Sequence, residues 1–183
     1  MKKSIVSIFI FTIALVFTNK VIAQKFPKLD KSPMDAATYP KNSRISDKLV
    51  KVIYSRPKLK KRALSKLAPA GKVWRTGADE ASEITFYKDV SFGGKDVKAG
   101  TYTLFTIPGD KEWIVILNTV KNVWGAYSYN EVDDVVRVKG RVSKAAKKTE
   151  AFSIVFEGKD DKATMYLGWG KTIVSVPVKE LVL

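Results

Sequence analysis

The sequence contains no cysteine and no histidine among its 183 residues. Without cysteine the protein forms no disulfide and offers no thiol for a lipid anchor, so its stability must come from the packed core. Without histidine it cannot build a Ser-His-Asp or Cys-His nucleophile system, or the usual zinc site. A metal site would need carboxylate and carbonyl oxygens, which favour calcium or magnesium. We predict no cofactor and no bound metal.

Acidic residues are also scarce, with 18 Asp and Glu against 33 Lys and Arg and a formal net charge of +15. A basic protein attracts anionic lipid headgroups, acidic polysaccharide or nucleic acid. The alternative interpretation is that a lysine-rich surface only keeps the protein soluble. We expect a glycan or an anionic envelope polymer as the partner, and we do not expect nucleic acid.

Residues 1–23 have the three parts of a secretory leader. Two lysines precede an apolar run over 5–17, and cleavage after Ala23 would leave Gln24 as the new N-terminus. Loss of the three leader lysines takes the formal charge from +15 to +12. A retained anchor is the alternative, but so short a run cannot span about 30 Å of hydrocarbon as a helix. We predict an exported bacterial protein, periplasmic or extracellular, that is not a lipoprotein and has no transmembrane span after leader removal.

The rest of the chain has the pattern of short strands separated by turns. Residues 24–47 are polar and contain three prolines, which predicts an extended lead-in to a single domain over 48–183. Only residues 58–70 favour a helical turn. The predicted strands are 49–55, 72–75, 82–87, 89–92, 95–97, 101–107, 112–118, 135–143, 150–157, 163–169 and 172–178. Their spacing predicts an all-β, antiparallel β-sandwich of about nine or ten short strands, with a β-barrel as the alternative.

One strand should be covered on both faces. Residues 113–117 are apolar at every position, which is typical of a central strand. We therefore expect Trp113 and Ile116, which point to opposite faces, both to be buried.

The densest group of polar and aromatic residues lies over 74–81. Trp74 would stack on a sugar face, while Arg75, Asp79 and Glu80 would bind hydroxyl groups or an anion. The alternative is a structural corner, in which Arg75 pairs with Glu80 at a sharp turn.

Two other segments are ligand-binding candidates. Arg56 follows a strand and precedes a proline, and it would either join Arg75 in an anion pocket or belong to a lattice of salt bridges. Trp124 and Tyr127 belong to an aromatic-rich loop that suits stacking on carbohydrate. The alternative for these rings is that they plug the open end of the sandwich, because large rings bury much area.

A basic stripe is predicted on one face of a strand. Arg137, Lys139 and Arg141 alternate with valines, so the three charges should share a sheet face. They would dock an anionic polymer, or they would form an ordinary solvated face.

Five segments combine aromatic, glycine and charged residues in a distinctive way. They are Tyr54-Ser55-Arg56-Pro57, Gly71 to Ala81, Ala99 to Pro108, Trp113 to Asn118 and Trp124-Gly125-Ala126-Tyr127. Together they resemble the family catalogued as domain of unknown function 2911, over most of residues 32–183. The resemblance implies an exported, single-domain bacterial protein and transfers no catalytic residue, because the family has no established activity. Asp79 stands where the family more often has asparagine, which implies that an amide is not essential there.

Three classes of function fit these observations. They are a non-catalytic binding module for glycan or another envelope polymer, a hydrolase using carboxylates among Asp79, Glu80 and Glu83, and a structural or assembly protein of the cell envelope. Glycosidase carboxylates face each other about 5 to 10 Å apart. Asp79 and Glu80 are adjacent, and neighbours on a strand point to opposite faces. We therefore favour the binding module over an enzyme, and the sequence gives no indication of oligomeric state.

Overall fold

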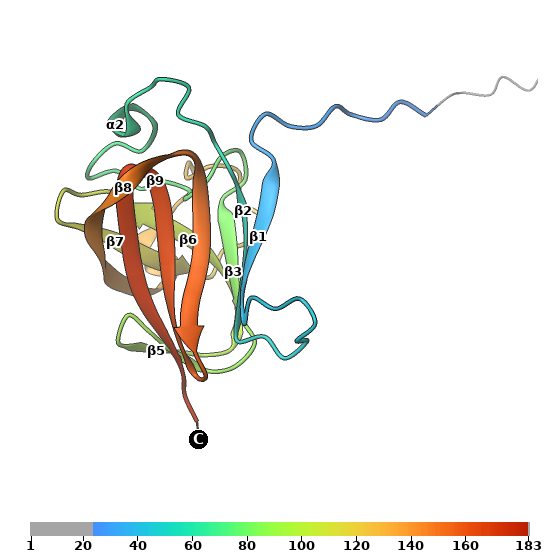
Figure 1. Ribbon diagram of the computed structural model, residues 1–183, viewed down its shortest axis with the longest axis vertical. Coiled ribbons are helices and arrows are strands. Elements are labelled where there is room, and N and C mark those ends of the chain that lie inside the picture. The colour runs from blue at the N-terminus through green and yellow to red at the C-terminus, as the bar shows by residue number, and fades with distance from the viewer. Residues whose placement is uncertain (1–23, 183) are drawn as a thin grey trace, which may run out of the picture.

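Alternating apolar residues build one nine-stranded antiparallel sheet in the computed structural model, which describes residues 24–182 (Figure 1). Its strands are β1 (Met34–Tyr39), β2 (Val50–Ser55), β3 (Ser82–Phe86), β4 (Val90–Phe92), β5 (Lys95–Val97), β6 (Gly100–Ile107), β7 (Glu112–Asn118), β8 (Asp134–Lys159) and β9 (Lys162–Glu180). Their order across the sheet is β1-β2-β3-β6-β7-β8-β9-β4-β5. The prediction of an all-β, antiparallel, single-domain fold is confirmed. In the described part of the chain the sheet is not closed into a barrel, because β1 and β5 are its two edges.

The long hairpin of β8 and β9 folds the sheet over its own core (Figure 1). The first part of β8, up to Arg141, pairs with β7, and from Arg141 onward β8 pairs with β9. The register then shifts between Lys144 and Ser153. Beyond this bend, β8 pairs with β9 on one side, and its other edge faces β1 and the end of β2. β8 and β9 each span two of the strands predicted from the sequence, and the predicted breaks between those strands fall at the bend.

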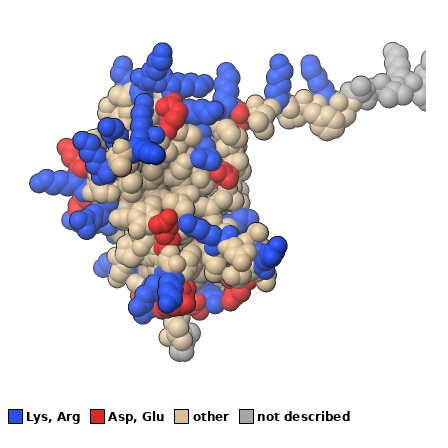
Figure 2. Space-filling model, viewed as in Figure 1, with Lys and Arg blue, Asp and Glu red and all other residues tan. Residues whose placement is uncertain are grey.

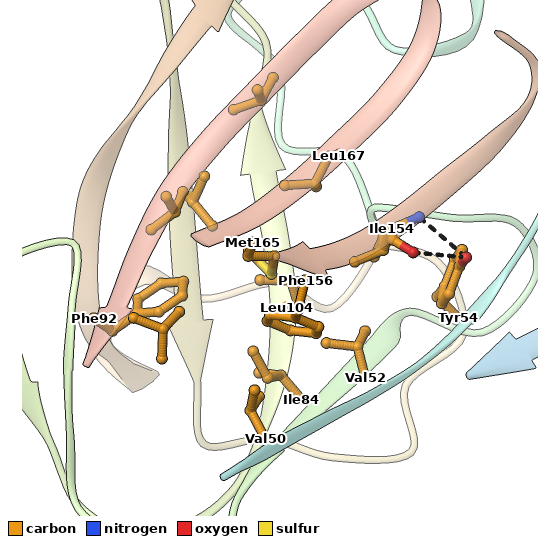
Figure 3. Close-up of a cluster of buried hydrophobic side chains, with 14 of the residues drawn as sticks. Val50, Val52, Tyr54, Ile84, Phe92, Leu104, Ile154, Phe156, Met165 and Leu167 are labelled. Atoms are coloured by element: carbon orange, nitrogen blue, oxygen red, sulfur yellow. Dashed lines mark hydrogen bonds between the residues drawn. The ribbon is translucent and has the colours of Figure 1, made fainter. Parts of the chain in front are cut away.

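The main core lies between the folded halves of the sheet (Figure 3). Leu104, Phe156 and Met165, from β6, β8 and β9, are fully buried there. A second, smaller cluster around Phe105 and Ile116 covers the other face of β6 and β7.

This double cover confirms the prediction for the central strand β7. Trp113, in the main core, is 3% exposed, and Ile116, in the smaller cluster, is 0% exposed. Each face of β7 is therefore covered by apolar side chains, as the continuous apolar run implies.

Two regions differ in detail from the sequence prediction. Residues 34–39 of the expected lead-in form the edge strand β1, so the sheet begins before residue 48. The expected strand at 72–75 is reduced to a single bridge between Trp74 and Thr106. The helical turn within 58–70 is present as α2 (Leu64–Leu67), and a 3-10 turn, η1 (Glu131–Asp133), precedes β8.

The predicted leader, residues 1–23, lies outside the described residues. Within residues 24–182, no helix has the length and apolar character needed to cross a membrane.

Candidate functional site

Tyr54 and Pro57 join the end of β2 to the unpaired edge of β8. The Tyr54 hydroxyl accepts a hydrogen bond from the Ile154 N–H at 3.0 Å and donates one to the Ile154 carbonyl at 3.3 Å (Figure 3). The Pro57 carbonyl accepts from the Phe152 N–H at 2.9 Å. Burial raises the pKa of the Tyr54 hydroxyl. We call these contacts, with those of Arg56 below, the β8 seam.

Arg56, a predicted ligand residue, is engaged in this seam. Its Nε donates to the Phe152 carbonyl at 3.2 Å, and its Nη2 donates to the Ser153 hydroxyl at 2.7 Å. Its Nη1 forms an ion pair with Asp35 at 2.9 Å. The side chain lines a hollow of about 320 Å³ between β1 and β8, apart from the other candidates. The arrangement matches the predicted salt-bridge lattice more closely than an anion pocket shared with Arg75.

The loop over 74–80 is a tight corner anchored by buried side chains. The Trp74 ring stacks on Trp169 at 5.4 Å within the main core, where no ligand reaches it. Thr76 is fully buried, and its hydroxyl bonds to that of Thr106 at 3.1 Å. The Ser82 hydroxyl donates to the Thr76 carbonyl at 2.7 Å. These contacts fix the loop from inside.

The expected pairing of Arg75 with Glu80 does not form. Neither residue, nor Asp79, takes part in an ion pair within the described part of the chain. Among the described residues, the Arg75 Nε atom is buried without a hydrogen-bond partner. Glu80 is exposed and Asp79 half-buried. The corner is therefore held by backbone and hydroxyl contacts instead of by a buried salt bridge.

The fold brings the 74–80 loop against the aromatic-rich loop. Glu80 and Trp124 form an antiparallel bridge, so their side chains lie on the same side of it. Two backbone hydrogen bonds flank this bridge: the Ala81 N–H donates to the Val123 carbonyl, and the Gly125 N–H donates to the Asp79 carbonyl, both at 2.9 Å. The 74–80 loop and the aromatic-rich loop around Trp124 thus form one rim, although they lie far apart in the sequence.

Two aromatic side chains of this rim, Trp124 and Tyr127, are open to solvent. Trp124 is 59% exposed and Tyr127 is 86% exposed, so neither plugs the sheet. Gly125 adopts a positive φ of 68°, and a Cβ there would lie 2.6 Å from the Tyr127 ring. Glycine is therefore required for the turn that presents both rings.

A hollow of about 400 Å³ opens beside Glu80, and we call it the Glu80 hollow. It is lined by Met34, Ile53, Tyr54, Ser55, Glu80, Ala81, Glu83 and Asn122. Met34 and Ile53 are 59% and 38% exposed, so the hollow has an apolar part as well as carboxylates. Glu83 Oε1 accepts the Asn122 N–H at 2.9 Å, which fixes that carboxylate.

The lining includes residues that sequence reasoning missed. Met34, Ile53 and Asn122 were not predicted as site residues, and Glu83 was named only as a carboxylate. An apolar residue on the outward face of a strand was the one available signal for Ile53. Asn122 follows a strand end in a polar loop and carries no local signal.

The basic stripe on β8 is largely neutralised. Arg137 pairs with Glu131 at 2.7 Å and with Asp134 at 2.9 Å. Lys139 pairs with Glu112 at 2.9 Å. Arg141 alone of the three forms no ion pair in the described part of the chain, although it lies across from Glu112 on β7. The stripe therefore carries little net charge for a polyanion.

Tyr129 ties the aromatic-rich loop to this stripe. Its hydroxyl donates to Asp134 Oδ2 at 2.6 Å and accepts from Arg137 Nη2 at 2.8 Å. Burial and the Asp134 carboxylate raise the pKa of Tyr129 to about 12. Its ring packs edge-on against Phe105 at 5.2 Å. This third ring of the loop is structural, in contrast to Trp124 and Tyr127.

Comparison with known proteins identifies a family for most of the chain. The family model described as a protein of unknown function (DUF2911) matches residues 32–178. The curated proteins and the solved structures contain no match to the chain. Within the described residues, no group of three or more acidic side chains is placed to hold a metal ion.

Proposed function

The chain belongs to the DUF2911 family of proteins of unknown function, and we propose that it is an exported, non-catalytic module that binds a glycan of the cell envelope at the Glu80 hollow. The observation that carries the proposal is the bridge between Glu80 and Trp124. It sets an exposed aromatic ring and an exposed carboxylate on one rim, next to a partly apolar hollow. Small-ligand sites combine apolar lining with a few placed polar groups in this way.

The chemistry of the hollow narrows the class of glycan. An ionised carboxylate only accepts hydrogen bonds, so Glu80 and Glu83 suit sugar hydroxyl groups or an amino group. The Trp124 ring offers an apolar surface to the C–H face of a sugar. Acidic sugars would face repulsion from the two carboxylates. The site therefore favours neutral or amino sugars over an anionic polymer.

Binding of soluble glycans to the chain from Gln24 tests this proposal. We expect an array to identify neutral or amino-sugar glycans, and Trp124→Ala to weaken their binding by about tenfold, a size seen when a large aromatic contact is lost. Tyr87→Ala is the matched control, because Tyr87 is 51% exposed but belongs neither to the hollow nor to the bridge of Glu80 with Trp124 beside it. Equal affinities of the Trp124→Ala variant and the parent would refute the assignment of the site.

A hydrolase is the second candidate, because Glu80 and Glu83 both line the hollow. Two carboxylates on one cavity are the minimum for acid–base cleavage of a glycoside. Release of reducing sugar from a bound glycan, abolished by Glu80→Gln with binding retained, would establish the enzyme and overturn the non-catalytic module.

A further inference from the structure

Exposed cationic side chains gather at the end of the domain that carries α2 and the bend of β8 and β9 (Figure 2). We call them the basic end face: Lys58, Lys60, Lys61, Arg62, Lys66, Lys72, Lys111, Lys144, Lys147, Lys148 and Lys171. They come from the segment that carries α2, the turn before β7 and the bend of β8 and β9.

Backbone contacts hold these segments together. The Leu59 N–H donates to the Glu150 carbonyl at 3.0 Å, and the Gly71 N–H donates to the Pro108 carbonyl at 2.9 Å. Lys111 accepts from the Val142 N–H at 3.2 Å through its carbonyl. The charges therefore share one fixed surface.

This surface has few compensating carboxylates. The segments 58–72, 108–111, 142–150 and 170–172 contain two acidic residues, Asp110 and Glu150. Within the described part of the chain, the single ion pair on the face joins Lys148 to Glu150 at 3.7 Å. On the β8 stripe, in contrast, Arg137 and Lys139 pair with three carboxylates between them. The basic end face therefore carries eleven cations against two carboxylates, a large local excess of positive charge.

The lead-in over 24–33 leaves the domain at the same end. The Arg56 N–H donates to the Pro33 carbonyl at 3.1 Å, two residues before Lys58 begins the basic end face. Figure 1 shows the lead-in extending away from the body of the domain.

The composition of this lead-in is amphiphilic. Phe26 and Leu29 are 81% and 89% exposed, and the same segment carries Lys25, Lys28 and Lys31 against one carboxylate, Asp30. It thus presents apolar side chains together with positive charge.

We infer that the basic end face and the lead-in together bind the surface of a membrane containing anionic phospholipid. Lysine ammonium groups act as point charges, which suits a fluid layer of headgroups better than a fixed anion pocket. Each lysine near such a surface gains affinity by electrostatic attraction. Phe26 and Leu29 would enter the boundary between headgroups and acyl chains. An acidic polysaccharide offers no apolar layer for these two side chains, so lipid is the favoured partner.

Vesicle co-sedimentation tests the inference with two matched triple variants. The chain from Gln24 carries all nine strands and both buried clusters, and it serves as the parent. The end-face variant combines Lys144→Gln, Lys147→Gln and Lys171→Gln. The control combines Lys159→Gln, Lys162→Gln and Lys179→Gln. Both sets lie on β8 and β9 and remove three exposed charges, but the control set lies near the hairpin tip at the opposite end. Thermal melts check that both variants are folded.

We expect the parent to bind phosphatidylglycerol-containing vesicles and not pure phosphatidylcholine vesicles. The end-face variant should lose affinity on the order of 10- to 100-fold, and the control should keep most of it. Binding by all of them should weaken as salt rises. A Phe26→Ser, Leu29→Ser variant should bind more weakly than the parent at physiological salt, where attraction between exposed charges is screened.

Three results would overturn the inference. Equal losses in the two triple variants would show that total charge matters and position does not. Unchanged affinity of the Phe26→Ser, Leu29→Ser variant would remove the argument for lipid. Binding to a soluble acidic polysaccharide without binding to anionic vesicles would assign the face to a glycan polymer. Each result is independent of the Glu80 hollow.

Discussion

Tyr54→Phe removes one hydroxyl group from the β8 seam and leaves the ring in place. In the parent protein, the hydroxyl satisfies both backbone groups of Ile154, at 3.0 Å and 3.3 Å. Beyond the bend, β8 faces β1 and β2 on that side but forms no strand ladder with them in the described part of the chain, so no other strand satisfies these groups. The ring itself packs edge-on against Phe152 at 5.7 Å and needs no hydroxyl for that contact.

The expected cost follows from the two groups that lose their partner. Tyr54 is 3% exposed and Ile154 5% exposed, so water does not readily replace the hydroxyl. A buried polar group left unsatisfied costs about 1–3 kcal/mol. Two effects lower the total below the sum for two groups. The 3.3 Å bond to the Ile154 carbonyl is weak, and folding of the variant does not require desolvation of a hydroxyl group. We therefore expect a loss of about 2–3 kcal/mol in the free energy of unfolding.

Urea unfolding measures this loss, with Tyr102→Phe as the control. The Tyr102 hydroxyl also donates to a backbone carbonyl, that of Lys98 at 2.9 Å, but at an exposed position where water replaces it. The control should lose less than about 1 kcal/mol. Amide exchange at Ile154 should also accelerate in Tyr54→Phe. A stability equal to the parent's, with unchanged exchange at Ile154, would refute the view that this hydroxyl completes the edge of β8.

Two further changes test the surroundings of the site. Burial and the Asp134 carboxylate raise the pKa of Tyr129 from the ordinary value of 10.0 to about 12. The protonated Tyr129 hydroxyl therefore contributes its full stabilisation below pH 10, and this stabilisation is lost as pH rises through 12. Allowing for solvent screening, urea titrations should show that the parent loses about 1–2 kcal/mol more than Tyr129→Phe over this range, and parallel pH profiles would contradict the assignment. Arg75→Met removes a buried donor that has no partner, so its unfolding free energy should equal or exceed the parent's by up to about 1 kcal/mol. A loss above about 3 kcal/mol in urea unfolding would instead indicate a buried charge pair.

The fold class could be predicted because its signals are local. Alternation of apolar residues and turn residues marks strands directly, and a fully apolar run marked β7 as doubly covered. The long hairpin was predicted as four strands, since the register shifts between Lys144 and Ser153 interrupt the alternation. The edge strand β1 was missed because its residues, 34–39, lie between prolines in a polar segment.

The site was predicted only in pieces, because its assembly depends on non-local contacts. Arg75, Glu80 and Trp124 were identified as candidates, but the pairing of Glu80 with Trp124 arises from the order of β3, β6 and β7 in the sheet. The seam joins Tyr54 to a residue 100 positions away, which no local pattern reveals. The sequence also could not show that Arg137 and Lys139 are matched by carboxylates on neighbouring segments.

Some of the most distinctive motifs of the chain hold the fold together, and others form the exposed rim. This difference decides which variants are informative about function. Arg56 forms an ion pair with Asp35 and hydrogen bonds to Phe152 and Ser153. Its replacement would therefore disrupt the β8 seam and lower stability whether or not a ligand binds nearby. Loss of binding in such a variant would therefore say nothing about the ligand site. Trp124 leaves 59% of its surface exposed, so its replacement should spare the core. Only rim residues of this kind separate recognition from folding.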